Sequence, residues 1–463
     1  MSGDLAKTQR IRDSVHGLIV FDGQGEDAAR DQTAWQLLNT PEMQRLRRVR
    51  QLGVSELTFP GATHTRFAHS VGVFDTARRL IEVLKAKLPD DEWRHDRADV
   101  VVFAALLHDI GHGPFSHAFE EAQKARGEEK NHEDWSAEII LQEDGKIRRI
   151  LERFRPGMAQ DIADLLRADV PQDAYHAVVS SSFDADRLDY LRRDRLMTGS
   201  GAGAIDFEWL LDNLRVAAIQ IGADDDDIFD AAQKTFCLDR KAFQAAESFL
   251  LARYHLFEQV YLHKTTRGFE QAVGQLLGWI AAAARGGDLG RLGLDQFDPL
   301  ASFFADGGGT LENYLALDDS IVWASAARVA KGPDANAKRL ARRLLDREPF
   351  KVLDIQGTYP RRPNEDLDAA EARWQAEIQR IDEMFADQIG ITVLKDVASI
   401  SIYSEIGSDQ TKAQKRLMIL VNEAPHEITQ LSDTIRALQA KRTLVRYFFS
   451  SDGERQRALG GQP

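Results

Sequence analysis

The residues with the most evident chemistry lie in one short stretch, Leu106 to His117, which reads LLHDIGHGPFSH. Three histidines and one aspartate, at positions 108, 109, 112 and 117, interrupt what is otherwise an apolar helix and its end. Imidazole and carboxylate groups together suit a first-row transition ion such as Mn, Fe, Co, Ni or Zn. The stretch therefore raises the hypothesis of a metal centre at a helix end.

A metal centre at His108 and Asp109 needs further ligands from other helices. The motif RFAHS supplies His69, and a carboxylate can come from the motif SSFDADRLDYLRRD. On the residues alone, the carboxylate candidates are Asp184, Asp186, Asp189 and Asp194. The alternative is a core His108 bonded to a backbone carbonyl, with Asp109 as a helix cap. That alternative leaves an aspartate buried without a partner, which is costly, so a metal centre is favoured.

The helices that must position these residues are predicted from the spacing of apolar side chains. One helix is expected over residues 40–53, with Thr40 as its N-cap. A second is expected from 65 to about 88, and the nearly all-apolar stretch 99–111 predicts a short central helix. Further helices are expected up to about residue 285, including the long stretch 241–284.

Strands are expected only towards the two ends of the chain. Residues 10–23 alternate apolar and polar side chains up to a glycine, which predicts a β-hairpin. Near the other end, residues 397–405 and 415–422 are typical of strands, and residues 426–449 of a helix packed on them.

The length of the chain predicts two lobes, because 463 residues exceed what one compact core usually holds. Glycine and aspartate are frequent in residues 285–299 and 304–310, which predicts loops there. The tail from residue 453 is expected to be frayed. We therefore place a large first lobe before about residue 285 and a smaller one after it.

Composition excludes several classes of protein. The net charge of −14 argues against broad binding of nucleic acid, which requires a basic surface. Cys237 is the only cysteine, which excludes a disulfide framework and a cysteine-based metal site. No apolar run is long enough to span a membrane, and the first residues contain no signal-peptide core. A cytoplasmic protein is expected, with no membrane contact and nucleic acid excluded as its main ligand.

The motifs RFAHS, HDIGHGPFSH and DADRLDYLRRD, in this order, resemble the H…HD…D signature of the HD-domain metal-dependent phosphohydrolases. Together with NTPEMQRLRRVRQLGVSELTFPGATHTRFAHSVGV, they resemble the deoxynucleoside triphosphate (dNTP) triphosphohydrolases. These include the sterile-alpha-motif-and-HD-domain type, here without its extra N-terminal module. The likeness runs from about Arg10 to Lys264 and more loosely to the LVRYFF motif. It implies a mainly α fold: an HD-domain helical core over 1–285 with an N-terminal β-hairpin, and a smaller oligomerisation or regulatory α+β lobe over 286–463.

The resemblance also implies the roles of individual residues near the metal. Asp186 is preferred to Asp184, because residues 187, 190 and 194 then match the substrate contacts of the family. The family has lysine at the position of Arg187, and the planar guanidinium differs in geometry from an ammonium group. The implied metal ligands are His69, His108, Asp109 and Asp186.

Catalysis and substrate binding are assigned on the same basis. His112 is placed at the α-phosphate, and His117 acts as proton donor to the leaving group, paired with His132 and oriented by Glu120. The implied substrate-binding residues are Gln51, Leu52, Arg66, Arg187, Tyr190, Asp194, Arg253, Tyr261 and Lys264. Without the resemblance, His132 would be read as a solvated loop histidine, and the cations as surface charges. The implied reaction releases a deoxynucleoside and triphosphate, with Mg on the substrate phosphates as a further candidate metal.

Two other classes of function stay open at this stage. An HD phosphodiesterase or nucleotidase would share the metal ligands but have no use for Arg66, Arg187 and Arg253 together. A non-catalytic HD regulatory protein would be expected to have lost metal ligands, and none is lost here.

Some members of the family are activated by a nucleotide bound between subunits. The resembling positions of this candidate activator site are Asn39, Gln44, Arg47, Arg347 and Lys351. Without the resemblance they would be solvated residues on helix faces. Asn39 replaces the guanine-reading carboxylate of the family, and Gln9 replaces its early lysine. We therefore expect a homo-oligomer built on a dimer, such as a tetramer or larger assembly, with no strict dependence on GTP.

Overall fold

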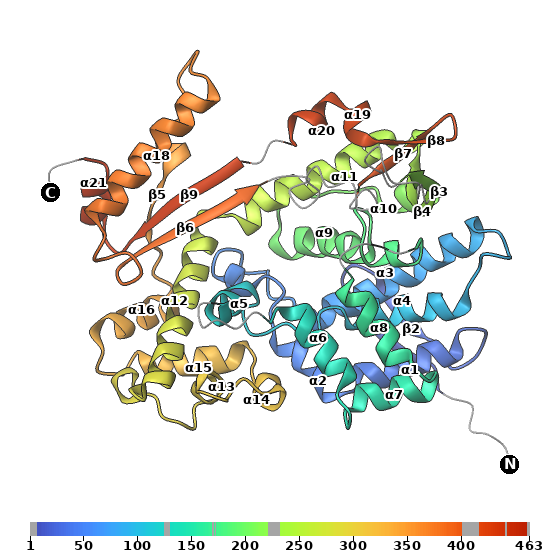
Figure 1. Cartoon of the computed structure of the whole chain (residues 1–463), viewed down its shortest axis with the longest axis horizontal. Helices are drawn as coiled ribbons and strands as arrows, with labels where there is room; N and C mark the ends of the chain where they lie inside the picture. The colour runs from blue at the N-terminus through green and yellow to red at the C-terminus, as the bar shows by residue number, and fades with distance from the viewer. Residues whose placement is uncertain are drawn as a thin grey trace, which may run out of the picture.

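Helices make up most of the molecule, and strands occur only as one hairpin and two small sheets (Figure 1). The structure, a computed structural model, describes residues 7–124, 130–168, 171, 173–220, 232–400, 416–439 and 442–460. The predicted fold class is confirmed: a mainly helical core with an N-terminal β-hairpin and small C-terminal α+β elements.

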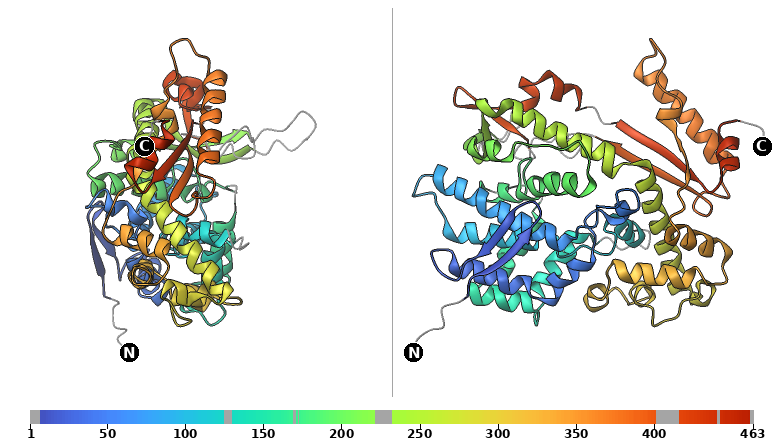
Figure 2. Two further views of the ribbon diagram at one scale, coloured as in Figure 1. Left: turned by 90° about the vertical axis from the view of Figure 1, so that its left-hand side faces the viewer. Right: turned by 180° about the vertical axis from the view of Figure 1, so that it is seen from behind.

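The N-terminal hairpin was predicted correctly. It consists of β1 (Gln9–Asp13) and β2 (Gly17–Phe21), which pair antiparallel. Gly17 begins β2 with a φ of +72°, a conformation that suits glycine because it has no Cβ. Phe21 stacks on Phe74 of α3 (Arg66–Lys87), with 5.4 Å between ring centroids. The hairpin therefore lies against the outside of the helices (Figure 2).

The helix predicted over residues 40–53 is shorter in the structure. α2 covers only Pro41–Arg45, with Thr40 as its N-cap, and a single 3-10 turn follows over Leu46–Arg48. Val49 is extended, and its carbonyl accepts a hydrogen bond of 2.9 Å from the backbone N–H of Arg66. This pairing with the start of α3 uses backbone groups that a longer helix would need. The segment after residue 48 is therefore free to line the site described below.

The two helices predicted around the central histidines are present. α3 is capped by Thr65, whose side chain accepts from the N–H of Ala68. All residues of α4 (His95–Leu107) from Val100 onwards are buried, as its apolar composition predicted. The other helices of this half are α1 (Ala28–Leu38), α5 (His117–Lys124), α6 (His132–Leu141), α7 (Lys146–Phe154), α8 (Met158–Arg167), α9 (Ala185–Thr198) and α10 (Phe207–Asp212).

The helical stretch predicted over 241–284 is present but interrupted. α11 (Phe243–Leu256) ends in a π-helical turn over Phe257–Tyr261, and α12 (Lys264–Gly286) follows. The apolar face of α12 packs in a second core with a group of short helices (Figure 1). These helices are α13 (Pro299–Phe304), α14 (Leu311–Leu315), α15 (Asp319–Val329) and α16 (Ala335–Leu345).

One sheet joins strands from distant parts of the sequence. Its order is β3-β4-β7-β8, and β4 pairs parallel with β7. The strands are β3 (Leu214–Gln220), β4 (Ala232–Asp239), β7 (Met418–Val421) and β8 (Ala424–Glu427). Strands from both sides of residue 285 thus share a sheet, and the division into 1–285 and 286–463 stays a prediction.

The helix predicted over 426–449 is wrong for most of its length. Only the short α19 (Ile428–Leu431) and α20 (Asp433–Ala437) are helical. Arg442–Phe449 is strand β9, the centre of a sheet with β5 (Lys351–Asp354) and β6 (Val393–Ile400). Its nearly continuous run of buried residues from Leu444 to Phe449 is typical of a strand covered on both faces. Of the predicted strand 397–405, residues 401–405 lie outside the described residues.

The prediction of a frayed tail is also wrong for most of its residues. Two further helices, α17 (Ile355–Thr358) and α18 (Leu367–Met384), precede β6, and α21 (Asp452–Ala458) follows β9. A capping box between Ser451 and Glu454 starts α21, and Ala458 is buried at its end. Residues 461–463 lie outside the described part of the chain.

Candidate active site

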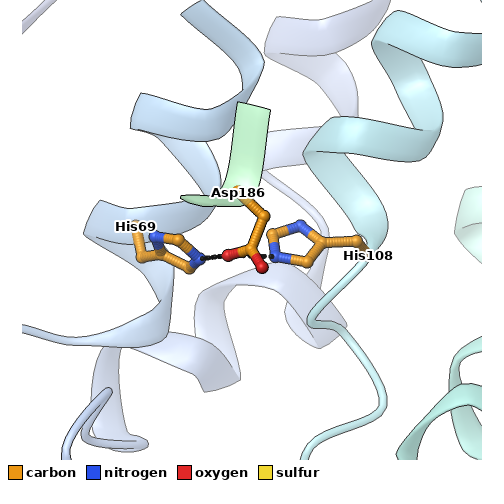
Figure 3. A group of neighbouring side chains, drawn as sticks. All are labelled: His69, His108 and Asp186. Atoms are coloured by element: carbon orange, nitrogen blue, oxygen red, sulfur yellow. Dashed lines mark hydrogen bonds and ion pairs between the residues drawn. The ribbon is translucent and has the colours of Figure 1, made fainter. Parts of the chain in front are cut away.

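Three helices bring the expected metal ligands together. His69 of α3, His108 directly after α4 and Asp186 of α9 point towards one another (Figure 3). Nε2 of His69 lies 2.9 Å from Oδ1 of Asp186, and Nε2 of His108 lies 3.9 Å from the same oxygen. Carboxylate oxygens of Asp109 lie 3.3 Å from Nε2 of His108 and 3.9 Å from Nε2 of His69. All four predicted ligands therefore converge.

The donor set fits a divalent transition ion. Nδ1 of His108 lies 2.8 Å from the carbonyl oxygen of Ala105, and Nδ1 of His69 lies 2.8 Å from Oδ2 of Asp189. These partners hold each ring so that Nε2 faces the centre, as is usual for metal-binding histidines. Nε2 of His108 is buried and has no hydrogen-bond partner among the described residues. Two imidazole nitrogens with two carboxylates suit such an ion.

The electrostatics of the cluster also favour a cation. Burial alone would lower the pKa of His69, but its hydrogen bonds to Asp186 and Asp189 raise that pKa to about 10. Burial would raise the pKa of Asp109, yet Arg66 and the two nearby histidines hold it well below its ordinary value. The centre thus carries ionised carboxylates and attracts positive charge.

A charged network behind His69 reaches the N-terminal hairpin. Asp189, which contacts His69, also lies 2.7 Å from Nε2 of His16 and accepts a hydrogen bond of 2.8 Å from Nε of Arg193. Nδ1 of His16 lies 3.1 Å from Asp75. The hairpin therefore helps to orient a metal ligand, a role of His16 that sequence reasoning missed because no motif singles it out.

The choice between Asp184 and Asp186 is supported by the position of each carboxylate. Asp184 caps α9, where its Oδ1 accepts from the backbone N–H of Arg187 at 2.8 Å. Its other oxygen pairs with the Arg187 guanidinium. Asp184 is therefore committed to the helix and to Arg187, whereas Asp186 faces the two histidines.

The predicted acid–base residues form a second cluster beside the first. Nδ1 of His132 lies 2.8 Å from Glu120, so this glutamate reaches the histidine it was expected to orient. The rings of His132 and His112 stack with 4.0 Å between centroids. They approach because Gly111 has no Cβ, which would lie 2.1 Å from the carbonyl oxygen of His132. His117 begins α5, but its side chain lies outside the described residues.

The two stacked imidazoles titrate in opposite directions. Burial, Arg66 and His132 hold the pKa of His112 well below its ordinary value. Burial lowers the pKa of His132 as well, but its hydrogen bond to Glu120 raises it above the ordinary value overall. Protonation of the pair is therefore favoured at His132 rather than at His112.

A cavity of about 430 Å³ adjoins the metal ligands, and Asp109 and Asp186 form part of its wall. Eight of the nine predicted substrate residues line this cavity, and they come from segments far apart in the sequence. They are Gln51, Leu52, Arg66, Arg187, Tyr190, Asp194, Arg253 and Tyr261. The ninth, Lys264, starts α12 in an exposed position and is not among the lining residues.

Arg66 stands where the cavity meets the metal ligands. Its NH1 donates to Oδ2 of Asp109 at 2.6 Å, while Nε and NH2 donate to Oγ of Ser116 at 3.1 and 2.7 Å. Ser116 was not singled out from sequence, although it lies within the GPFSH motif. This serine fixes the plane of the guanidinium that contacts Asp109.

The wall of the cavity also carries an acidic group, Asp194. The carboxylate of Asp194 is held between Tyr261, whose hydroxyl donates to Oδ2 at 2.6 Å, and His64, whose Nε2 lies 2.8 Å from Oδ1. His64 is buried and was also missed, although it lies two residues before Arg66 in GATHTRF. Together these groups form an acceptor site suited to a hydroxyl group.

The residues of the candidate activator site fall into two groups within one chain. Asn39, Gln44 and Arg47 lie around α2, where Nε of Arg47 donates to Oε1 of Gln44 at 2.8 Å. Arg347 follows α16 and donates to the carbonyl of Leu57, and Lys351 starts β5. A site between subunits would need both groups, so their role stays a prediction.

Among the described residues, no helix is both long enough and apolar enough to cross a membrane.

Comparisons with known proteins agree with this site. The HD domain family model matches residues 66–191, which include all four candidate metal ligands. The uncharacterized protein YwfO of Bacillus subtilis (strain 168) is 33% identical over 368 residues, which cover 80% of this chain and 76% of YwfO. A Dictyostelium discoideum protein, the deoxynucleoside triphosphate triphosphohydrolase SAMHD1 homolog, is 32% identical over 244 residues, 50% of this chain and 43% of that protein.

The fold is similar to that of a solved structure as well. A phosphohydrolase from Bacteroides thetaiotaomicron (BT4208) superposes with a TM-score of 0.71 at 24% identity, over 96% of this chain and 100% of that one. Taken with the converging histidines and aspartates, the family model and the match to YwfO show that the chain belongs to the HD-domain family.

Proposed function

We propose that the protein hydrolyses dNTPs to a deoxynucleoside and inorganic triphosphate. The observation that carries this proposal is the composition of the 430 Å³ cavity. Its wall includes two candidate metal ligands, four arginines, of which Arg267 pairs with Asp396 and Glu270, and the acceptor site at Asp194. Arg66, Arg187 and Arg253 offer enough planar guanidinium groups to bind a whole polyphosphate chain. A mononucleotide or a cyclic nucleotide would leave part of this cationic surface unused.

The metal would be held by His69, His108, Asp109 and Asp186. A bound divalent ion there would polarise a phosphoryl oxygen and lower the pKa of a water molecule. Mn, Fe, Co, Ni and Zn are all suited to these ligands, and Mg could accompany the substrate phosphates. The similarity to the Dictyostelium discoideum SAMHD1 homolog, a triphosphohydrolase by name, supports the choice of a triphosphate substrate.

The proposed reaction consumes one water molecule. The water oxygen loses one proton and forms a bond to the α-phosphorus, the bond between that phosphorus and the 5′-oxygen breaks, and the 5′-oxygen takes up one proton, so that protons balance over the reaction. By resemblance to the family, His117 supplies this proton. Glu120 raises the pKa of His132, and so would favour the protonated form of this histidine, which the resemblance pairs with His117. Arg66 would balance the negative charge that develops on the phosphate.

Product identification tests the proposal. The purified protein is incubated with each of the four dNTPs and rNTPs and a panel of divalent metals. Chromatography separates nucleoside from nucleotide, and phosphate release is measured with and without added pyrophosphatase. Deoxynucleoside with intact triphosphate is expected. A dNMP with pyrophosphate, or a dNDP with orthophosphate, would contradict the proposed bond cleavage. Cleavage of monophosphates or cyclic nucleotides alone would identify a phosphodiesterase or nucleotidase instead.

A further inference from the structure

A short segment of the second half of the chain contacts the loop that follows the metal ligands. Residues 314–319, from the end of α14 to the start of α15, bond to the backbone of residues 110–115. The hydroxyl of Tyr314 donates to the carbonyl oxygen of Gly111 at 2.5 Å. Arg45 is buried between the two segments and donates to the carbonyl oxygens of Leu317, Ile110 and His112.

Asp319 forms the most specific of these links. Its two carboxylate oxygens accept from two backbone N–H groups that belong to separate walls of the site. Oδ1 accepts from Phe115 at 2.9 Å, and Oδ2 accepts from Arg50 at 2.8 Å. Arg50 directly precedes Gln51 and Leu52, which line the substrate cavity, and Phe115 lines it too. One buried carboxylate thus ties together two segments that were distant in sequence.

The loop that Asp319 holds is strained. Phe115 and Ser116 have φ values of +52° and +44°, in the left-handed region that side chains with a Cβ rarely adopt. Such a conformation persists only when its surroundings impose it. The result of the strained turn is that Oγ of Ser116 faces Arg66 and accepts two hydrogen bonds from it. Asp319 is therefore one contact away from the serine that orients the phosphate-facing guanidinium.

We propose that Asp319 is a positioning residue: it holds the 113–116 loop in the conformation that sets Ser116 against Arg66, and so couples the second half of the chain to the phosphate side of the active site. The role extends beyond the proposed substrate, because it depends only on Arg66 contacting a phosphate group. A displacement of α15 would reach Arg66 through this carboxylate and through the ring of Trp323, which packs on Phe115 with 5.6 Å between centroids.

The matched substitutions are Asp319→Asn and Asp318→Asn. Asparagine has the shape of aspartate but one acceptor oxygen, so one of the two backbone N–H groups would meet an amide N–H instead. Asp318 lies next to Asp319, caps α15 and pairs with the half-exposed Arg48, so Asp318→Asn controls for the helix end. Burial raises the pKa of Asp319 to about 7, and assays at pH 8 keep it ionised.

Two readouts use the full chain loaded with Mn²⁺. Calorimetry measures the affinity for inorganic triphosphate, and steady-state kinetics measure kcat/KM for dATP. Asp319→Asn is expected to weaken both about 10-fold or more, as for loss of a hydrogen bond to a charged group. Bound metal should change little, because His69, His108 and Asp186 are not displaced. Asp318→Asn should stay within about twofold of the unmodified protein on both readouts.

A double-mutant cycle separates positioning from general destabilisation. If Asp319 acts through Ser116, the double variant Asp319→Asn, Ser116→Ala should lose no more affinity for triphosphate than the single variant that loses more. Multiplied losses would overturn the proposal. Ser116→Ala by itself must weaken triphosphate binding, and an unchanged affinity would overturn the proposal even if Asp319→Asn failed to fold. The calorimetric arm does not depend on which ester is cleaved, so failure of dATP hydrolysis would count only against the proposed function.

Discussion

The hydroxyl of Tyr261 donates a hydrogen bond of 2.6 Å to Oδ2 of Asp194 across one end of the substrate cavity. Tyr261 comes from the π-helical turn after α11, whereas Asp194 comes from α9. His64 holds the other carboxylate oxygen of Asp194, so the carboxylate that positions the tyrosine ring is itself held in place. A ring held in this way can act as a steric limit on what binds beside it.

We predict that this ring selects deoxyribose over ribose. The resemblance to the dNTP triphosphohydrolases implies that the ring of Tyr261 packs against the sugar 2′ carbon and leaves no room for a hydroxyl group. Exclusion of that hydroxyl should favour dATP over ATP by on the order of 100-fold in kcat/KM. Tyr261→Ala should remove most of this preference. Tyr261→Phe, which retains the ring, should retain it, and equal rates for ATP and dATP in the unmodified protein would contradict the prediction.

The second prediction concerns the metal. His108→Ala or Asp109→Ala should abolish bound transition metal and activity but leave a folded protein, because these residues converge on one centre. Metal content by mass spectrometry, with circular dichroism for folding, provides the measurement. Full metal occupancy in both variants would exclude the assignment.

A matched pair of carboxylates tests the third prediction. Asp186→Asn should remove the metal, since Asp186 faces both histidines. Asp184→Asn should retain the metal and lower activity less, because Asp184 pairs with Arg187 and caps α9. The reverse order of metal loss would show that the ligand has been misassigned.

The pH dependence of activity should report on the pair formed by His132 and Glu120. The glutamate raises the pKa of His132 against the effect of burial. Glu120→Gln removes the negative charge and lowers that pKa, so charged His132 is lost at a lower pH. The alkaline fall of kcat/KM should therefore move about one pH unit towards acid. Glu138→Gln, on the same helix as His132 but paired with the partly exposed Lys130, should leave the profile unchanged.

The sequence predicts those candidate site residues that lie in one short motif or on neighbouring helices. His69, His108 and Asp109 follow from two motifs on two helices, and their convergence required only that α3 and α4 pack together. Asp186 and the arginines depended on the family resemblance. Their positions in one cavity are a property of the packing of α9 and α11 that spacing alone did not supply.

The residues missed from sequence act through contacts between distant segments. His16 reaches His69 through Asp189, and Asp319 reaches Arg66 through the 115–116 turn. Neither residue type nor local spacing distinguishes these from ordinary polar residues. The same cause explains the error at 426–449. Strand β9 forms by pairing with β5 and β6, and these two strands lie up to about a hundred residues earlier in the sequence.

The last prediction is that activity does not depend strictly on GTP. A carboxylate accepts from both the ring N–H and the exocyclic amine of guanine, whereas Asn39 has one acceptor oxygen. Its amide nitrogen already donates to the carbonyl of Trp35 at 2.7 Å, and the neighbouring Gln44 and Arg47 bond to each other. The measurements are dATP hydrolysis with and without GTP or other nucleotides, and light scattering for the mass of the assembly, where a dimer-based oligomer is expected.

Asn39→Asp provides the matched variant for this prediction, because it restores the second acceptor without changing the size of the side chain. The unmodified protein should hydrolyse dATP without GTP, and any activating nucleotide should show weak preference for guanine. Asn39→Asp should shift that preference towards GTP, on the order of 10-fold for one added charged hydrogen bond. The prediction would be wrong if the unmodified protein hydrolysed dATP only when GTP is present and did not respond to other nucleotides. Guanine would then be recognised without a carboxylate at position 39.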